Sequence, residues 1–125
     1  MSREINAFFD NNEWYYTSKS GTKVEFTDGF GPYESLLGAL AGCYYSTLED
    51  IAKDKVSWQS VAIHVSGEKR SEVPTTLKET KLELTVKGVS AEELFKECAK
   101  EASNCCSIFQ TIAKVSAMKL VINFK

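Results

Sequence analysis

Residues 31–55 read GPYESLLGALAGCYYSTLEDIAKDK, and the rest of the chain is best understood relative to this stretch. Apolar residues recur in it at spacings of three and four, which is typical of an amphipathic helix. These positions are Leu37, Leu40, Ala41, Tyr44, Leu48, Ile51 and Ala52. Because Pro32 suits a loop or the first position of a helix, the pattern predicts a long helix from about Tyr33 to about Asp54.

Three short strands are predicted before this helix. Runs rich in aromatic and β-branched residues are separated by the turn-forming pairs Asn11-Asn12 and Ser20-Gly21. The runs are EINAFFD (residues 4–10), EWYYTSK (13–19) and TKVEFTD (22–28). We expect them to pair as antiparallel strands.

Two longer strands are predicted after the helix. Residues 58–70 and 76–87 alternate apolar and polar side chains, and a loop that contains Pro74 joins them, so we expect a hairpin. Ser90 followed by Glu93 has the spacing of a capping box, which predicts the start of a second helix.

The remaining elements complete an α+β pattern. The second helix is predicted over residues 91–103, a short third helix over 107–114 and a last strand over 118–125. The order βββ-α-ββ-α-α-β indicates mostly antiparallel sheet, because parallel βαβ units need strict alternation of strand and helix. A chain of 125 residues with 43% hydrophobic residues is expected to form one domain, residues 1–125.

The charge and hydropathy of the chain exclude several classes of protein. A formal net charge of -2 gives no basic surface for nucleic acid. No segment approaches the roughly 20 apolar residues that cross a bilayer, and the N-terminus lacks the apolar run of a signal peptide. We therefore expect a cytoplasmic protein that binds neither nucleic acid nor membrane.

Four cysteines are the candidate functional residues. A reducing compartment disfavours structural disulfides, and the chain has no CxxC pair and only one histidine, His64, so no metal or other cofactor is expected. Cys43 lies on an apolar side of the predicted helix. Small residues surround it, namely Gly38, Ala39, Ala41 and Gly42. Either another helix packs closely against this patch, or a ligand or a second cysteine comes within reach of Cys43.

Cys105 and Cys106 lie between the second and third predicted helices, where Asn104 and Ser107 are alternative capping residues. A thiol at a helix N-terminus gains stabilisation of its thiolate from unpaired backbone N–H groups. The pair is therefore either a reactive site or small-residue filling of a helix corner. Cys98 aligns with apolar positions of the second helix, which predicts a place in the core.

Three segments resemble the OsmC/Ohr family. Residues 31–55 are similar to the central cysteine-bearing helix of that family, and NCCSIFQTIAKVSAMKLVINF (104–124) is similar to its second cysteine helix and last strand. GEKRSEVPTTLKETKLELTVKG (67–88) resembles the hairpin of the small OsmC-like branch. The resemblance covers about residues 24–125 in matching order.

This resemblance implies an OsmC-like fold, an interlocked homodimer and a stress-response enzyme that reduces organic hydroperoxides. In such enzymes a peroxidatic thiolate becomes a sulfenic acid, a second cysteine captures it as a disulfide, and a dithiol reduces the disulfide. By position, Cys43 matches the peroxidatic cysteine and Cys106 the resolving cysteine, with Cys105 as a possible alternative. Glu34 matches a glutamate that holds an activating arginine, although nine residues within one helix would put Glu34 and Cys43 on opposite faces.

The source of that activating charge is open. The chain has only Arg3 and Arg70, and neither occurs in a motif that matches the family. A nearby positive charge lowers a cysteine pKa, so activation would rest on a lysine such as Lys19 or Lys23, or catalysis would be weak or absent. The alternative function is a small-molecule binding or redox-sensing protein on the same scaffold.

Overall fold

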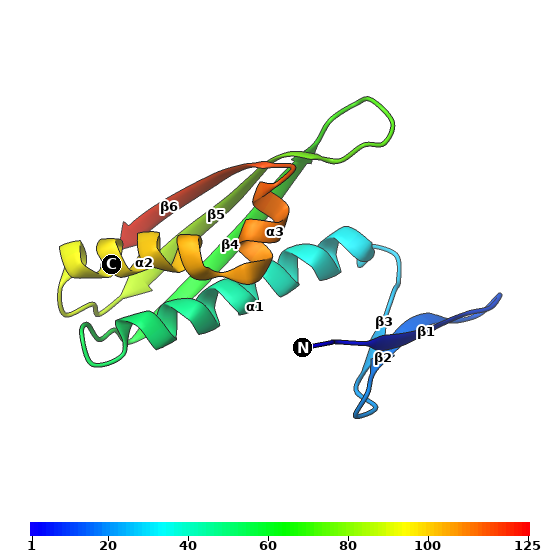
Figure 1. Cartoon of the computed structure of the whole chain (residues 1–125), viewed down its shortest axis with the longest axis horizontal. Helices are drawn as coiled ribbons and strands as arrows, with labels where there is room; N and C mark the ends of the chain where they lie inside the picture. Colours follow the sequence, from blue (N-terminus) through cyan, green and yellow to red (C-terminus); the bar gives the residue numbers. More distant parts are fainter. The chain divides into compact units, whose positions relative to one another are not determined.

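The computed structural model describes all of residues 1–125 and has the predicted order of elements (Figure 1). The elements are β1 (Ile5–Phe9), β2 (Trp14–Ser18), β3 (Lys23–Glu25), α1 (Pro32–Ala52), β4 (Ser60–Lys69), β5 (Leu77–Lys87), α2 (Glu92–Cys105), α3 (Ser107–Ala113) and β6 (Ala117–Phe124). The α+β class is confirmed. The chain divides into two compact units, residues 1–36 and 37–125, so the single domain stays a prediction.

The first unit is built on an antiparallel sheet in the order β1-β2-β3. The predicted turn at Asn11-Asn12 is confirmed, because the Asp10 carboxylate accepts hydrogen bonds from the backbone N–H groups of Asn12 (2.8 Å) and Glu13 (2.7 Å). These bonds, from Glu13 first and then Asn12, hold the pKa of Asp10 below its ordinary value. The hairpin register is thus fixed at the turn.

This first unit leaves much apolar surface in water. Every residue of β1 is exposed, and four large apolar side chains of the β1–β2 hairpin are about half exposed or more: Ile5, Phe8, Phe9 and Trp14. A small antiparallel sheet without a covered face has little stability of its own. Exposed large apolar side chains gathered on one hairpin are typical of surfaces that take part in binding.

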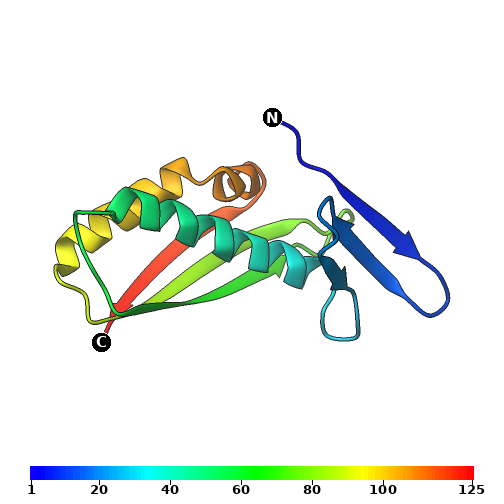
Figure 2. The same ribbon diagram turned by 90° about the horizontal axis from the view of Figure 1, so that it is seen from below.

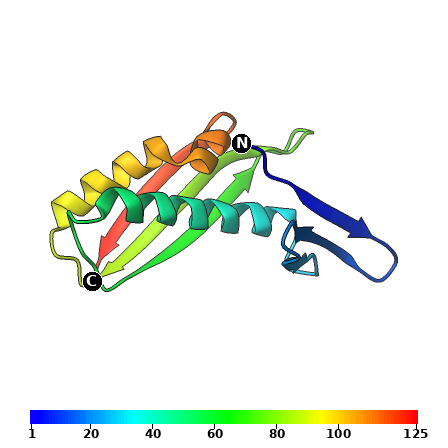
Figure 3. The same ribbon diagram turned by 60° about the horizontal axis from the view of Figure 1, so that its bottom comes forward.

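The second unit is one sheet with its helices on a single face. The strand order is β4-β5-β6, and α1 and α2 lie side by side across this sheet (Figures 2 and 3). The predicted hairpin is confirmed, with Ile63 opposite Leu84 and Val65 opposite Leu82. β5 and β6 pair in parallel, so the connection through α2 and α3 forms one βαβ-type unit in a mostly antiparallel fold.

The core of the second unit lies between this sheet and the helices. Every second residue over much of β5 is buried, because alternate side chains of a strand point to the same face. The fully buried residues of three elements form this core: Leu40, Tyr44 and Leu48 of α1, Leu82, Leu84 and Val86 of β5, and Phe95, Ala99 and Ala102 of α2. The Tyr44 hydroxyl donates to the Ala99 carbonyl at 2.7 Å and so fixes α1 against α2.

Two capping predictions are wrong. The Ser90 hydroxyl does not cap α2: it accepts a hydrogen bond from the backbone N–H of Ser57 at 2.9 Å, and the N-cap residue Ala91 makes no side-chain cap bond. The cap of α3 is Cys106, whose Sγ accepts from the Phe109 N–H at 3.4 Å. Tertiary partners and a soft sulfur acceptor have displaced the residues that local preference favoured.

The small-residue patch of α1 is uncovered within this chain. A Cβ built at Gly38 or at Gly42 meets no atom within 4 Å. Each interior glycine costs a helix up to about 1 kcal/mol relative to alanine. No part of the chain therefore packs closely against these two glycines, whereas the expected approach of a second cysteine to Cys43 is found, since the Cys106 Sγ lies 3.2 Å from the Cys43 Sγ.

Candidate functional site

Two of the four cysteines meet in the second unit. Cys43 lies in the middle of α1, and Cys106 lies at the break between α2 and α3, 63 positions later in the chain. Their Sγ atoms are 3.2 Å apart, and the Cys106 thiol donates toward Cys43. All four cysteines are free thiols. A disulfide has an S–S distance of about 2.05 Å, so these two sulfurs are within about 1.2 Å of bonding distance.

Cys106 is held in place by the helix break itself. Its backbone has an extended conformation (φ -70°, ψ 117°), which ends α2 and starts α3 at a single residue. Its N–H donates to the Ala102 carbonyl at 2.8 Å, and its side chain is fully buried. Burial raises the pKa of Cys106; the Phe109 N–H opposes this effect, and the neighbouring Cys43 sulfur adds to it.

Cys43 is the more accessible thiol of the pair and the more acidic one. It is half-buried, and its Sγ also lies 3.9 Å from the Ser107 hydroxyl oxygen. Partial burial raises the pKa of Cys43, but the Ile108 N–H, the Cys106 thiol and the Ser107 hydroxyl and N–H together outweigh burial. The pKa of Cys43 therefore lies below its ordinary value. All these donors are neutral groups.

The other two cysteines lie outside this pair. Cys105 is the last residue of α2 and is exposed, with its thiol 3.6 Å from a Glu101 carboxylate oxygen. Residual desolvation and the Glu101 carboxylate raise the pKa of Cys105, which disfavours a reactive thiolate there. Cys98 is buried in the core, as predicted.

Glu34 has a local partner at the start of α1. Its carboxylate accepts a hydrogen bond from the Gly31 N–H at 2.7 Å, and a carboxylate in the first turn is favoured by the helix dipole. Both Glu34 and Cys43 lie in α1, so their spacing of nine residues puts them on opposite faces of this helix.

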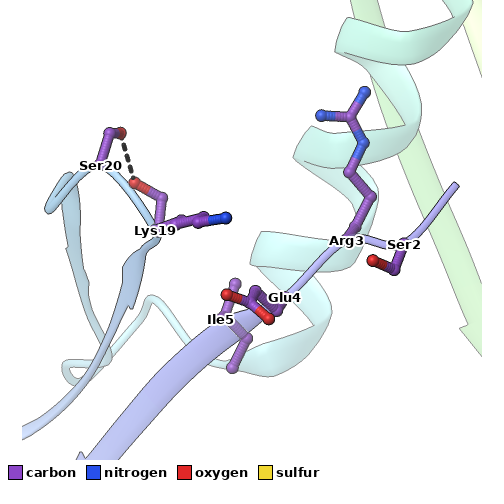
Figure 4. A pocket seen from close by; sticks show the side chains of 7 residues that line it. Ser2, Arg3, Glu4, Ile5, Lys19 and Ser20 are labelled. Carbon is purple, nitrogen blue, oxygen red and sulfur yellow. Dashed lines mark hydrogen bonds between the residues drawn. The ribbon is translucent and has the colours of Figure 1, made fainter.

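The cations considered for activation are engaged elsewhere or exposed. Arg3 and Lys19 line an open hollow of about 610 Å³ in the first unit, where the Lys19 ammonium points toward the N-terminal segment (Figure 4). Lys23 pairs with Glu25 at 3.3 Å and with Glu13 at 3.5 Å, and Arg70 donates to the Pro74 carbonyl at 2.7 Å.

Two further features concern metal binding and membrane insertion. The structure contains no cluster of three or more His, Cys, Asp or Glu side chains that could hold a metal ion. None of its helices combines the length and the apolar character needed to cross a membrane.

Ser107 is the site residue that the sequence did not single out for chemistry. The sequence offered it as a cap of α3, and the structure puts its hydroxyl beside the Cys43 sulfur. The available signal was its position directly after Cys106, because the residue that follows Cys106 in the chain is brought toward Cys43 together with it. This position points to Ser107 only when Cys43 and Cys106 are known to lie in contact.

Known structures share this architecture. A hypothetical protein from Aquifex aeolicus VF5 matches with a TM-score of 0.87 and 17% identity, over 100% of this chain and 97% of that one. An OsmC-like protein from Mycoplasma pneumoniae matches with a TM-score of 0.87 and 19% identity, over 99% and 97%. The organic hydroperoxide resistance protein OhrB of Bacillus subtilis matches with a TM-score of 0.70 and 17% identity, over 98% of each chain. At these identities the likeness concerns the fold.

The sequence comparison identifies the family directly. No curated protein sequence matches the chain significantly. The family described as OsmC-like protein, in contrast, matches residues 25–120, which is well over half of the chain and includes both Cys43 and Cys106. The resemblance seen in the sequence is thus confirmed, and the chain belongs to the OsmC-like protein family.

Proposed function

We propose that this protein is a thiol-dependent peroxidase that reduces organic hydroperoxides through Cys43 and Cys106. The observation that carries the proposal is the 3.2 Å separation of their Sγ atoms. Structural relatives named as organic hydroperoxide resistance proteins, from Bacillus subtilis and Elizabethkingia anophelis, support the choice of substrate class.

The first step uses Cys43. Its thiolate attacks the terminal, hydrogen-bearing oxygen of ROOH, an S–O bond forms, the O–O bond breaks, and the departing alkoxide takes a proton from water and leaves as ROH. Cys43 is thereby oxidised to a sulfenic acid. Cys43 suits this role because its thiol is half-buried and acidic, whereas Cys106 is fully buried and has a raised pKa.

The second step uses Cys106. Its thiolate attacks the Cys43 sulfur, an S–S bond forms, the S–O bond breaks, and the hydroxyl leaves as water with the proton from Cys106. Oxidation of Cys43 prepares this step, because the sulfenic acid is neutral and the negative sulfur that helped keep Cys106 protonated is gone. The Phe109 N–H remains to stabilise the Cys106 thiolate.

The third step regenerates the enzyme. A dithiol attacks the Cys43–Cys106 disulfide, and two exchange reactions return both protein thiols while the dithiol is oxidised to its own disulfide. The net reaction converts ROOH and a dithiol into ROH, water and a disulfide. Because it needs reduced thiols, we place the protein in the cytoplasm.

The role of Glu34 stays a prediction of the family resemblance, and no step above passes through it. The same holds for Cys105 as an alternative resolving residue. Its exposed thiol lies against Glu101, whereas Cys106 lies against Cys43, so we assign resolution to Cys106.

We further propose a homodimer. The exposed apolar side chains of β1 and β2 and the uncovered glycines of α1 are two surfaces that a second copy would cover. An exchange of the β1–β2 hairpin between copies would give the interlocked dimer that the resemblance implies. Sedimentation equilibrium tests this directly: we expect twice the chain mass of 13.9 kDa, and a monomer at micromolar concentration would refute the assembly.

The decisive experiment for the reaction is peptide mapping after one equivalent of cumene hydroperoxide. Trypsin cuts after lysine and arginine, so Cys43 falls in residues 24–53 and the Cys105-Cys106 pair in residues 101–114. We expect these two peptides to be joined by a disulfide that fragmentation assigns to Cys106. Cys106→Ser should leave a dimedone-reactive sulfenic acid at Cys43, and Cys105→Ser should still form the bond. Four unmodified thiols would refute the peroxidase.

The second candidate is a binding or redox-sensing protein with the same fold. The neutral surroundings of Cys43 favour it, because no cation is among the groups that lower its pKa. It predicts negligible turnover with a dithiol, together with a rise in melting temperature when the right small molecule binds.

A further inference from the structure

The strongest remaining question is how Cys43 is activated without a positive charge. The donors that lower its pKa are backbone N–H groups, a thiol and a hydroxyl. Of these, the hydroxyl of Ser107 is the one side chain that lies outside the redox pair. It can therefore be changed without removing a reacting sulfur.

The Ser107 hydroxyl is free for this contact. It begins α3, but the cap of that helix is the Cys106 sulfur, which accepts from the Phe109 N–H. The only hydrogen-bond partner of the Ser107 Oγ in the chain is the Cys43 Sγ, at 3.9 Å. A serine hydroxyl has one proton to donate, and an ionised acceptor binds it more strongly than a neutral one.

The contact also has a suitable position. Cys43 Sγ is approached by the buried thiol of Cys106 at 3.2 Å and by the exposed hydroxyl of Ser107 at 3.9 Å. The two contacts differ in what happens to them during the proposed reaction. In the proposed second step Cys106 loses its proton and no longer donates a hydrogen bond to Cys43, whereas the Ser107 hydroxyl keeps its proton.

We propose that Ser107 is a further residue of the catalytic site, whose hydroxyl donates a hydrogen bond to the Cys43 thiolate and so supplies part of the activation that a cation would provide. This inference rests on the proposed function for its role in peroxide reduction. The proton stays on the Ser107 oxygen, and no bond is made or broken at Ser107.

The size of the effect follows from two opposing changes. Loss of one hydrogen bond to a charged group is expected to lower the thiolate fraction at neutral pH about tenfold. A more basic thiolate is also more nucleophilic, with a Brønsted coefficient of about 0.4–0.5, so each remaining thiolate reacts about threefold faster. Removal of the hydroxyl should therefore slow Cys43 about threefold at pH 7 and speed it about threefold where the thiol is fully ionised.

The test is the pH dependence of Cys43 alkylation by iodoacetamide, read from the tryptic peptide that contains residues 24–53. Ser107→Val and Ser107→Thr form a matched pair, because both side chains are β-branched and only threonine keeps the hydroxyl. We expect crossing pH profiles for wild type and Ser107→Val, with a midpoint at higher pH in the variant. Ser107→Thr should follow the wild type.

A matched control separates activation from loosening of α3. Thr111 lies on the same helix and its hydroxyl donates to the Ser107 carbonyl at 2.8 Å, so Thr111→Val removes a hydroxyl without touching the sulfur. An unchanged profile in Ser107→Val would overturn the inference, and so would an equal shift in Thr111→Val. If Ser107→Val does not fold, Ser107→Ala gives the same reading. Alkylation needs no peroxide, so this result stands apart from the disulfide mapping that tests the proposed function.

Discussion

Formation of the Cys43–Cys106 disulfide should make the protein markedly more stable. The two residues are 63 positions apart, and closing a loop of that size lowers the entropy of the unfolded chain by an amount worth about 4 kcal/mol at 25 °C. Two local costs oppose this gain. The sulfurs must close from 3.2 Å to about 2.05 Å, and the Cys106 sulfur gives up part of its cap on α3, worth about 1 kcal/mol. We expect a net gain of about 2–4 kcal/mol.

The assay is urea denaturation of the reduced and the oxidised protein, followed by circular dichroism. Both forms are compared at one protein concentration, because the stability of a dimer depends on concentration. Cys106→Ser, treated with the same oxidant, should show no gain, whereas Cys105→Ser should gain as much as the wild type. The reasoning fails if protein with a verified Cys43–Cys106 bond is no more stable than the reduced form, because the reduced fold would then not hold the two thiols ready to bond.

Three further predictions concern single groups. At pH 7 Cys43 should be alkylated faster than the more exposed Cys105, because the pKa of Cys43 is lowered and that of Cys105 is raised; raising the pH should narrow the difference, and peptide-resolved mass spectrometry measures it. Tyr44→Phe should cost about 1–3 kcal/mol in urea denaturation, because it leaves the Ala99 carbonyl without its buried donor. Gly42→Leu should leave the chain folded, since no atom of the chain lies near a Cβ there, but should weaken a dimer in sedimentation if a second copy packs on this patch.

The long elements were predictable because their signals are local. The apolar spacing around Leu40, Tyr44 and Leu48 gave α1 within two residues at each end, and alternation gave the β4–β5 hairpin. Helical and strand periodicity are properties of a short window of chain, so they survive whatever the window packs against. The choice of Cys43 and Cys106 came from the resemblance to the family and not from periodicity.

The misplaced caps and the parallel β5–β6 pair show where local reasoning ends. Ser90 has the spacing of a capping residue, yet its hydroxyl bonds to the distant Ser57, and a strand does not reveal from its own sequence which neighbour it will join. In such cases a hydrogen bond to a nearby residue competes with one of similar strength to a residue distant in the chain. The sequence cannot decide between them.

The sequence by itself determined the kinds of element, their order and the presence of a thiol in the middle of a long helix. The resemblance preferred Cys106 to Cys105 by position, but only the tertiary structure showed that these two neighbours in the chain differ completely in burial and in partner. It also brought Ser107 to the Cys43 sulfur. The physical reason is that secondary structure depends on contacts within a few residues, whereas the environment of a thiol depends on how α1, α2 and α3 pack across a separation of more than sixty residues.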